Sequence, residues 1–367
     1  MNSTASFGLL ALFGLACQSE QPKTPDNEMP SVASDSVYTV LEDLNITFAE
    51  GLAHDETSAS PFAVPLQLDV YYPDTSSTNR PVFMWIHGGG FTGGTRTKPE
   101  IVEMARYYAS RGWVFVSIDY RTTEHLCDSE AMGSCKDKLI DMAQNGLDKV
   151  TAFYKGIAPS EWIEFVIEQG PETVKQLQQS IAQYTAQRDA KAALRWIVAN
   201  ASTYDIHTDY ITVGGNSAGA ITTIALGISN LEDFTDEISL DEDSTLSTTN
   251  LDEAYDVQSM VYFWGSNDKL DLFEAVYDLE QYDRYDASDP ELFMGHGEAE
   301  DLQTPYAGAL ELQDIYDSLG IYSELATLRL PDGSPAGHGA WDGQVDGKGL
   351  SELTFEFLVE RQALSLK

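Results

Sequence analysis

Ser217 lies in the stretch Gly215-Asn216-Ser217-Ala218-Gly219, between a run typical of a buried strand (residues 210–213) and a run typical of a helix (residues 220–226). A Gly-x-Ser-x-Gly motif in this context predicts a nucleophile elbow, a sharp turn that holds the serine hydroxyl clear of the sheet. Glycine is required at both positions because side chains there would collide with the neighbouring strand and helix. The hydroxyl would stand at a helix N-terminus, where developing negative charge is favoured. The alternative is a turn of small residues that contains a serine by chance.

A serine nucleophile needs a base to take its proton, a carboxylate to orient that base, and N–H donors for the oxyanion. Among the six histidines of the chain, His338 lies in a flexible loop, residues 336–341, after the last expected strand. A parallel sheet could return a residue at this place to the elbow, so we expect His338 to be the base; the alternative is a structural loop histidine. The other histidines lie in or beside other expected elements: His54, His87, His125, His207 and His296.

The elements that must position these residues alternate between strand and helix along most of the chain. The expected strands lie at residues 37–48, 66–72, 82–86, 113–118, 210–213, 257–264, 291–294 and 322–330, and the expected helices at 99–111, 189–199, 220–226 and 305–319. The runs at 82–86 and 113–118 are apolar throughout, as expected for strands buried on both faces. The alternation predicts an α/β fold, with a mostly parallel central sheet covered by helices on both faces.

Two segments interrupt this alternation. Residues 121–188 form a long insertion with helix-like stretches at 160–168 and 172–186, and they are numerous enough to form a helical cap over the site. The alternative is a peripheral decoration. Residues 230–256 form an acidic loop rich in Asp, Glu, Ser and Thr.

Taken together, residues 65–362 resemble the α/β-hydrolase superfamily, specifically its carboxylesterase and lipase branch. The resemblance rests on motifs that occur in the family's order, each beside the expected strand. These are His87-Gly-Gly-Gly-Phe91, Gly215-x-Ser217-x-Gly219, His296-Gly297 with a following acid, and Gly337-His338-Gly339. The stretch 188–196 also looks like the helix that precedes the elbow in this branch.

The resemblance implies which groups complete the site. The oxyanion would be bound by the backbone N–H groups of Gly89, Gly90 and Ala218. For the acid, counting from His296 selects Glu300, whereas counting back from Pro305 selects Asp301. We prefer Asp301, because the four residues after it look like the family's approach to the helix. Asp268, after the preceding strand, is a third candidate.

The expected function is that of a serine carboxylic-ester hydrolase acting through an acyl-enzyme on Ser217, with His338 as general base and then general acid. The substrate would be a small-molecule or polymeric ester, and the mechanism requires neither metal nor organic cofactor. Two alternatives stay open. The same triad could cleave amides, peptides or lactones, and some carboxylesterase-like domains are non-catalytic binding modules.

The N-terminal segment of the chain indicates an exported protein. Residues 1–17 read as a signal peptide, either of the bacterial lipoprotein type with a lipid on Cys17 or of ordinary secretion. Residues 18–36 read as a flexible linker, which leaves 37–367 as the catalytic domain. We therefore expect a bacterial source and either a periplasmic or outer-membrane lipoprotein or a secreted protein.

The remaining cysteines and the overall charge add two expectations. Cys127 and Cys135 form an even pair in an exported chain and are a disulfide candidate. The chain has 59 acidic and 21 basic residues, with a net charge of −38. Such a surface repels phosphate backbones, which excludes nucleic acid as a partner.

Overall fold

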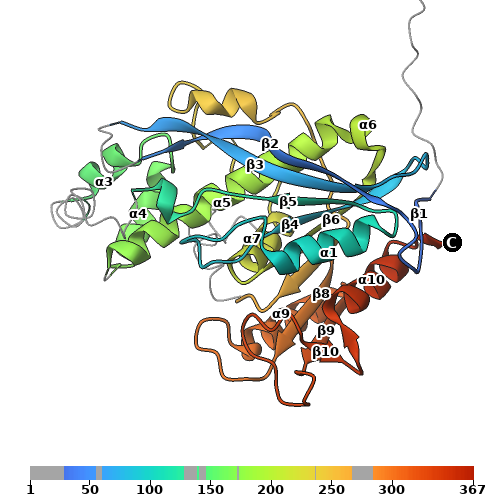
Figure 1. Ribbon diagram of the computed structural model, residues 1–367. Coiled ribbons are helices and arrows are strands. Elements are labelled where there is room, and N and C mark those ends of the chain that lie inside the picture. Colours follow the sequence, from blue (N-terminus) through green and yellow to red (C-terminus); the bar gives the residue numbers. More distant parts are fainter. Residues whose placement is uncertain are drawn as a thin grey trace, which may run out of the picture.

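A large twisted sheet forms the centre of the protein. The computed structural model describes residues 29–54, 60–127, 139, 146–171, 173–235, 237–266 and 284–367. Within them, the large sheet has eight strands in the order β2-β3-β5-β4-β6-β7-β8-β9 (Figure 1). These strands are β2 (Val40–Ala53), β3 (Phe62–Pro73), β4 (Arg80–Ile86), β5 (Val114–Ile118), β6 (Ile206–Asn216), β7 (Ser259–Phe263), β8 (Glu291–Gly297) and β9 (Ser323–Leu328).

Most neighbouring strands of the large sheet run in the same direction. β3 pairs antiparallel with both β2 and β5, whereas every pair from β5 to β9 is parallel. The predicted α/β fold with a mostly parallel sheet is therefore confirmed. Parallel strands place their carboxyl ends at one edge of the sheet, which is where the loops after β4, β6, β8 and β9 must meet.

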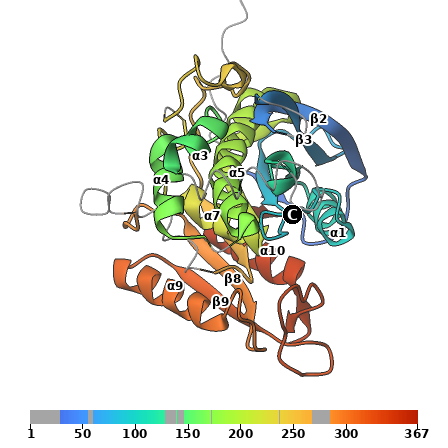
Figure 2. The ribbon, with the colours of Figure 1, turned by 90° about the vertical axis from the view of Figure 1, so that its left-hand side faces the viewer.

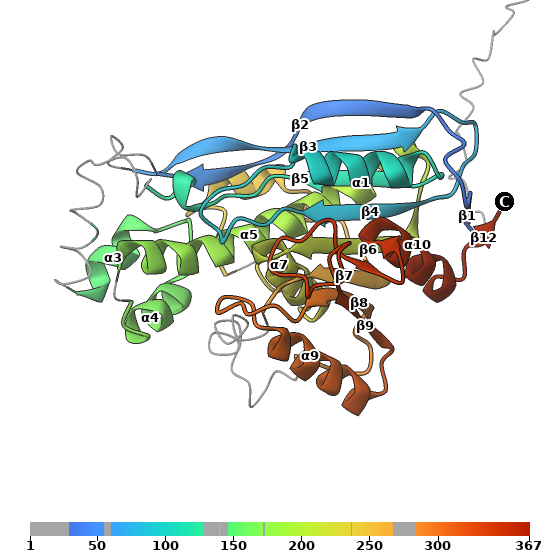
Figure 3. The same cartoon turned by 60° about the horizontal axis from the view of Figure 1, so that its bottom comes forward.

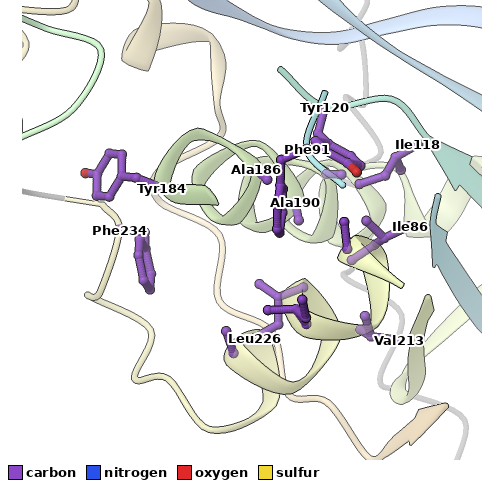
Figure 4. Packing of buried hydrophobic residues seen from close by; sticks show 14 of the residues in the cluster. Ile86, Phe91, Ile118, Tyr120, Tyr184, Ala186, Ala190, Val213, Leu226 and Phe234 are labelled. Carbon is purple, nitrogen blue, oxygen red and sulfur yellow. The ribbon is translucent and has the colours of Figure 1, made fainter. Parts of the chain in front are cut away.

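Helices cover both faces of this sheet (Figure 2). Side chains alternate along β4, which is buried throughout. Val82, Met84 and Ile86 belong to one apolar cluster, whereas Phe83 and Trp85 belong to the other. The first cluster is closed by α5 (Val174–Ala199), α7 (Ala218–Gly227) and α9 (Tyr306–Leu319), and the second by α1 (Pro99–Ala109) and α10 (Leu350–Arg361). Figure 4 shows part of the first cluster.

Shorter elements complete the described chain. The remaining helices are η1 (Thr123–His125), α3 (Leu147–Phe153), α4 (Ser160–Glu168), α6 (Ala201–Tyr204) and η2 (Ser244–Thr248). Two small sheets pair β1 (Ser31–Val32) with β12 (Ser365–Leu366), and β10 (Gln344–Val345) with β11 (Lys348–Gly349). None of the helices in the described ranges is both long and apolar enough to cross a membrane.

The insertion at 121–188 is less separate from the core than its sequence suggests. The expected helices at 172–186 and 189–199 are one continuous helix of 26 residues, α5. It begins at a capping box in which Thr173 and Gln176 satisfy each other's backbone N–H groups, and nothing between 186 and 189 breaks it. The carboxyl part of the insertion is thus a core helix. α3 and α4 lie at the end of the molecule opposite the C terminus (Figure 3).

Buried cations on α5 hold the acidic segment 230–256 in place. The ammonium of Lys191 donates to the carbonyl oxygens of Asn230 and, at 2.8 Å, Asp233. Arg195 Nε donates to the Thr249 carbonyl oxygen at 2.8 Å. The acidic segment is therefore bound to the core through its backbone as well as through its carboxylates.

Lys191 gives the stability of the protein a specific pH dependence. Burial lowers the pKa of this ammonium from 10.5 to about 8. Between these two values the unfolded chain keeps a proton that the folded chain has released, so the free energy of unfolding rises with pH. Relative to the Lys191→Met variant, we expect the wild-type protein to gain up to about 3 kcal/mol between pH 7 and pH 10.5.

Urea unfolding of both proteins at a series of pH values measures this difference. Methionine carries no ionisable group, so the pH dependence of the difference between the two proteins reports the titration of Lys191. A difference that stays constant across this range would contradict a lowered lysine pKa.

Candidate active site

Ser217 occupies the turn between β6 and α7. Its backbone has φ 54° and ψ −120°, in the region that side chains rarely adopt. Its N–H donates to the Phe263 carbonyl oxygen, at the end of β7, over 2.9 Å. β6 ends at Asn216 and α7 begins at Ala218, so the strand, turn and helix expected around this serine are all present.

The two glycines of the motif are required by close backbone contacts. A Cβ on Gly215 would lie 2.3 Å from the Gly219 carbonyl oxygen. A Cβ on Gly219 would lie 2.0 Å from the carbonyl oxygen of Ile86, the last residue of β4. These contacts are with backbone atoms, which cannot move aside as a flexible side chain could. A side chain at either position would therefore collide with the backbone, as the sequence predicts.

The glycine-rich turn after β4 lies directly against Ser217. A Cβ on Gly88 would lie 3.0 Å from the Cβ of Ser217, and the Gly88 N–H donates to Asn216 Oδ1 over 3.2 Å. Gly89 and Gly90 follow with φ of 137° and 60°, values that favour glycine. The structure thus brings the two predicted oxyanion glycines to the elbow, and Ala218 is part of the elbow itself.

The carbonyl groups of this turn are each held by a hydrogen-bond donor. His87 Nδ1 lies 2.8 Å from the Gly88 oxygen, and Thr92 donates to the Gly89 oxygen from its N–H at 3.0 Å and its hydroxyl at 2.9 Å. In a trans peptide, the C=O and the following N–H point in opposite directions. Holding the Gly88 and Gly89 oxygens therefore orients the N–H groups of Gly89 and Gly90.

Gln179 connects the insertion to the same turn. Its Nε2 donates to the Gly90 carbonyl oxygen at 2.7 Å, and it lies in the first turns of α5. This contact favours a role for the insertion at the site over a purely peripheral one. The sequence analysis did not select Gln179 or Thr92, because neither belongs to a motif.

His87 is a structural residue of the turn. Its ring is buried and stacks on Tyr120 at 4.4 Å between centroids, and the Tyr120 hydroxyl donates to the His87 carbonyl oxygen at 2.9 Å. Burial lowers the pKa of this imidazole, so the ring is neutral at neutral pH. It anchors the turn, and His338 stays the predicted base.

The predicted acid and the predicted base come together from two loops. Asp301, between β8 and α9, places Oδ2 3.0 Å from Nδ1 of His338, in the loop after β9. Glu300, the neighbouring candidate, is exposed. Asp268 lies outside the described residues. The geometry therefore favours Asp301 as the partner of His338.

A close backbone approach joins these two loops. A Cβ on Gly297, the last residue of β8, would lie 2.0 Å from the Ala336 carbonyl oxygen. The same oxygen accepts a hydrogen bond from the Ala299 N–H at 3.1 Å. Glycine at 297 thus allows the loop that carries Asp301 to lie directly on the loop that carries His338.

Asp301 is held as an ionised acceptor. Burial raises its pKa, but the hydroxyl of Thr304 and the N–H of Gln303, at 2.5 and 2.8 Å, outweigh burial and hold the pKa below its usual value. The Thr304 hydroxyl also lies 2.7 Å from His338 Nδ1. The sequence analysis missed Thr304; its place three residues after the acid, just before Pro305, was the available signal.

The end of β7 lies beside both halves of the site. Phe263 accepts the hydrogen bond from the Ser217 N–H, and the ring of the next residue, Trp264, lies edge-on to that of His338 at 6.5 Å. Among the described residues, no hydrogen bond joins the Ser217 hydroxyl to His338. Such bonds are often long without substrate and shorten in the reacting complex.

Two other predictions from the sequence concern metals and cysteines. Within the described ranges, no group of three or more His, Cys, Asp or Glu side chains is placed to hold a metal ion. Cys127 is buried, but Cys135 lies outside the described residues, so the Cys127–Cys135 disulfide stays a prediction.

A comparison with protein families identifies the group to which this chain is related. The BD-FAE family model matches residues 68–145 and 175–304, which is more than half of the chain. The chain belongs to the BD-FAE family. The matched residues include Ser217 and Asp301, whereas His338 lies beyond them. The unmatched stretch between the two segments, residues 146–174, holds α3 and α4.

The chain is also similar to individual proteins and solved structures. The chain is 24% identical over 161 residues to para-nitrobenzyl esterase from Bacillus subtilis; the match spans 44% of this chain and 24% of that protein. Among solved structures it resembles an esterase from Thermogutta terrifontis, with 19% identity, a TM-score of 0.51 and coverage of 85% and 92% of the two chains. The propionate-bound form of that esterase has 18% identity and a TM-score of 0.53, with coverage of 87% of this chain and 97% of that chain. A truncated carbohydrate esterase from gut microbiota has 17% identity and a TM-score of 0.50, with coverage of 92% of this chain and 100% of that chain. The resemblance to the α/β-hydrolase superfamily is therefore confirmed in both family and fold.

The choice between the two adjacent carboxylates can be tested through the reactivity of Ser217. We expect Asp301→Asn to slow modification of Ser217 by a fluorophosphonate about 10³- to 10⁴-fold, because an amide at this place can hold the wrong imidazole tautomer. The matched variant Glu300→Gln, one residue away and exposed, should react at the wild-type rate. The opposite ranking would assign the acid to Glu300.

Proposed function

We propose that this protein is a serine carboxylic-ester hydrolase with Ser217, Asp301 and His338 as its catalytic triad. The observation that carries the proposal is the 3.0 Å contact between Asp301 and His338, at the edge of the sheet where the strained Ser217 and its glycine-rich turn lie. Membership of the BD-FAE family and the esterase names of the relatives support the same reaction class.

The reaction begins with attack on the ester carbonyl carbon. His338 Nε2 takes the proton of the Ser217 hydroxyl as the oxygen–carbon bond forms, and the carbonyl oxygen becomes an oxyanion. The N–H groups of Gly89, Gly90 and Ala218 stabilise that negative charge. Asp301 stabilises the imidazolium formed at the same moment.

The intermediate collapses by breaking the bond to the alcohol. The imidazolium gives its proton to the leaving alkoxide, which departs as an alcohol and leaves an acyl group on Ser217. Water then attacks this acyl group, and His338 takes a proton from the water as the bond forms. The second intermediate collapses by breaking the bond to the serine oxygen, which receives the proton from the imidazolium, and the acid is released.

Two other functions use or resemble the same site. The triad could cleave amides or lactones, and comparing p-nitrophenyl acetate with p-nitroacetanilide separates an esterase from an amidase. A non-catalytic binding module usually lacks a member of the triad, whereas all three candidates are present here. Such a module would also stay unlabelled by a fluorophosphonate.

Ser217 is the residue on which the proposal depends. We expect Ser217→Ala to lower the hydrolysis of short p-nitrophenyl esters by about 10⁴-fold or more, because no acyl-enzyme can form. The matched variant Ser229→Ala, two residues beyond the end of α7, should keep wild-type rates. Circular dichroism and thermal unfolding establish that both variants are folded. Full activity in folded Ser217→Ala would remove this serine from the mechanism.

We further propose that the chain is exported and carries a lipid on Cys17, in a segment that lies outside the described residues. The apolar run at 5–16 that ends at Cys17 supports this. In a bacterial host, the wild-type chain should incorporate radiolabelled palmitate and fractionate with membranes, because a lipid anchor buries its acyl chains. Cys17→Ser should lose both properties. An unlabelled wild-type chain in the medium would instead indicate ordinary secretion.

A further inference from the structure

The hydroxyl of Thr304 forms a closed triangle with the two members of the triad. Thr304 Oγ1 lies 2.5 Å from Asp301 Oδ2 and 2.7 Å from His338 Nδ1, and the third side, from Oδ2 to Nδ1, is 3.0 Å. Thr304 is buried, with 4% of its surface exposed, whereas the side chain of His338 is 36% exposed. The threonine thus provides a buried contact for an exposed imidazole.

The positions of the protons follow from what each group can donate. An ionised carboxylate only accepts hydrogen bonds, whereas a hydroxyl has one proton to donate and lone pairs that accept. The short contact between the Thr304 and Asp301 oxygens therefore requires the hydroxyl proton to lie between them. Toward His338, the threonine oxygen can then offer only a lone pair.

The same assignment of donors and acceptors determines the tautomer of the imidazole. If His338 Nδ1 had no proton, its lone pair would face a lone pair of Thr304 at 2.7 Å and the carboxylate at 3.0 Å, and both contacts would be repulsive. With the proton on Nδ1, one N–H is shared between the two acceptors. Nε2 then keeps its lone pair for the proton of Ser217.

We propose that Thr304 is a positioning residue that holds the proton of the neutral His338 ring on Nδ1, which leaves Nε2 free as the base, and fixes the orientation of the ring. This inference rests on the proposed function, since it gives the ring its role as a base. Asp301 alone would contact the ring at one atom, Nδ1, and a single contact leaves the ring free to rotate about it. The threonine oxygen is a second acceptor whose position is fixed, because Pro305 and the start of α9 follow it directly.

The consequence for the reaction is confined to the steps in which His338 changes charge. When the imidazolium forms, its Nδ1–H already has two acceptors, so no group has to move to stabilise the new charge. Thr304 is buried and contacts the ring at Nδ1, whereas the proton of Ser217 is taken at Nε2. Its removal should therefore change the rate of the chemical steps and leave substrate binding unchanged.

Kinetics of three threonine variants test this role. Thr304→Val keeps the shape but removes the hydroxyl, and we expect kcat on a short p-nitrophenyl ester to fall about 10- to 100-fold with KM unchanged, as for loss of a hydrogen bond to a charged group. Thr304→Ser keeps the hydroxyl and should stay near the wild-type kcat. Thr327→Val is the matched control, because it removes a hydroxyl in the neighbouring strand whose hydrogen-bond partner among the described residues is the Tyr306 hydroxyl, at 2.6 Å.

Nitrogen NMR of histidine-labelled protein supplies a readout that a purely structural role would not move. The two ring nitrogens of His338, assigned by the signals lost in His338→Gln, should show the proton on Nδ1 in the wild-type protein. In Thr304→Val a fraction of the Nε2–H tautomer should appear. Thr304→Ala serves the same purpose if the valine variant does not fold.

Several results would overturn the inference. One is that kcat and the tautomer both stay unchanged in folded Thr304→Val or Thr304→Ala. Another is that Thr304→Ser loses as much kcat as Thr304→Val. The NMR measurement needs no substrate, so it still decides the role of Thr304 if the protein does not hydrolyse esters. Loss of the proposed function and loss of this inference are therefore separate outcomes.

Discussion

Backbone atoms of β4, β6 and α7 lie so close together around Ser217 that no side chain fits between them. A Cβ on Gly219 would lie 2.0 Å from the Ile86 carbonyl oxygen, and one on Gly215 would lie 2.3 Å from the Gly219 carbonyl oxygen. This approach forces Ser217 into a conformation that costs of order 1–3 kcal/mol. It also brings the end of β4, and with it the glycine-rich turn, against the serine. The strain at Ser217 and the position of the glycine-rich turn are thus two results of one contact.

Buried charge pairs extend this arrangement from the sheet to α5. Arg121, just after β5, contacts Asp189 at 2.6 Å with both side chains buried. Such a pair adds little net stability, but breaking it leaves a buried charge unpaired at a cost of about 3–5 kcal/mol. The pair therefore penalises any other register of α5 against the sheet. Because Gln179 lies on the same helix, the register also determines whether its amide reaches the Gly90 carbonyl.

The two halves of the site are held in different ways. Ser217 and the proposed oxyanion donors belong to the centre of the sheet, where backbone contacts leave little freedom. His338 lies on an exposed loop, and its position depends on Asp301, on Thr304 and on the contact between Gly297 and Ala336. The contacts at Nδ1 hold the ring on one side and leave Nε2 free for the proposed proton transfers.

The sequence by itself determined what depends on neighbours along the chain. The elbow requires glycines two positions from Ser217, buried strands require continuous apolar runs, and the alternation of strand and helix requires a mostly parallel sheet. These rules act over a few residues, so they can be read from the order of the amino acids. The position of His338 after the last strand also followed, since a parallel sheet gathers its carboxyl ends at one edge.

Only the tertiary structure decided the partners that come from distant segments. Glu300 and Asp301 are adjacent and chemically alike, and the path of the loop alone turned Asp301 toward His338 and left Glu300 exposed. Thr304 and Gln179 have no motif, because a hydroxyl or an amide acquires its role from the atom it faces. The continuity of α5 through residue 188 likewise depended on core packing. Hydrogen bonds between residues far apart in sequence are fixed by three-dimensional proximity, which the spacing of residues does not encode.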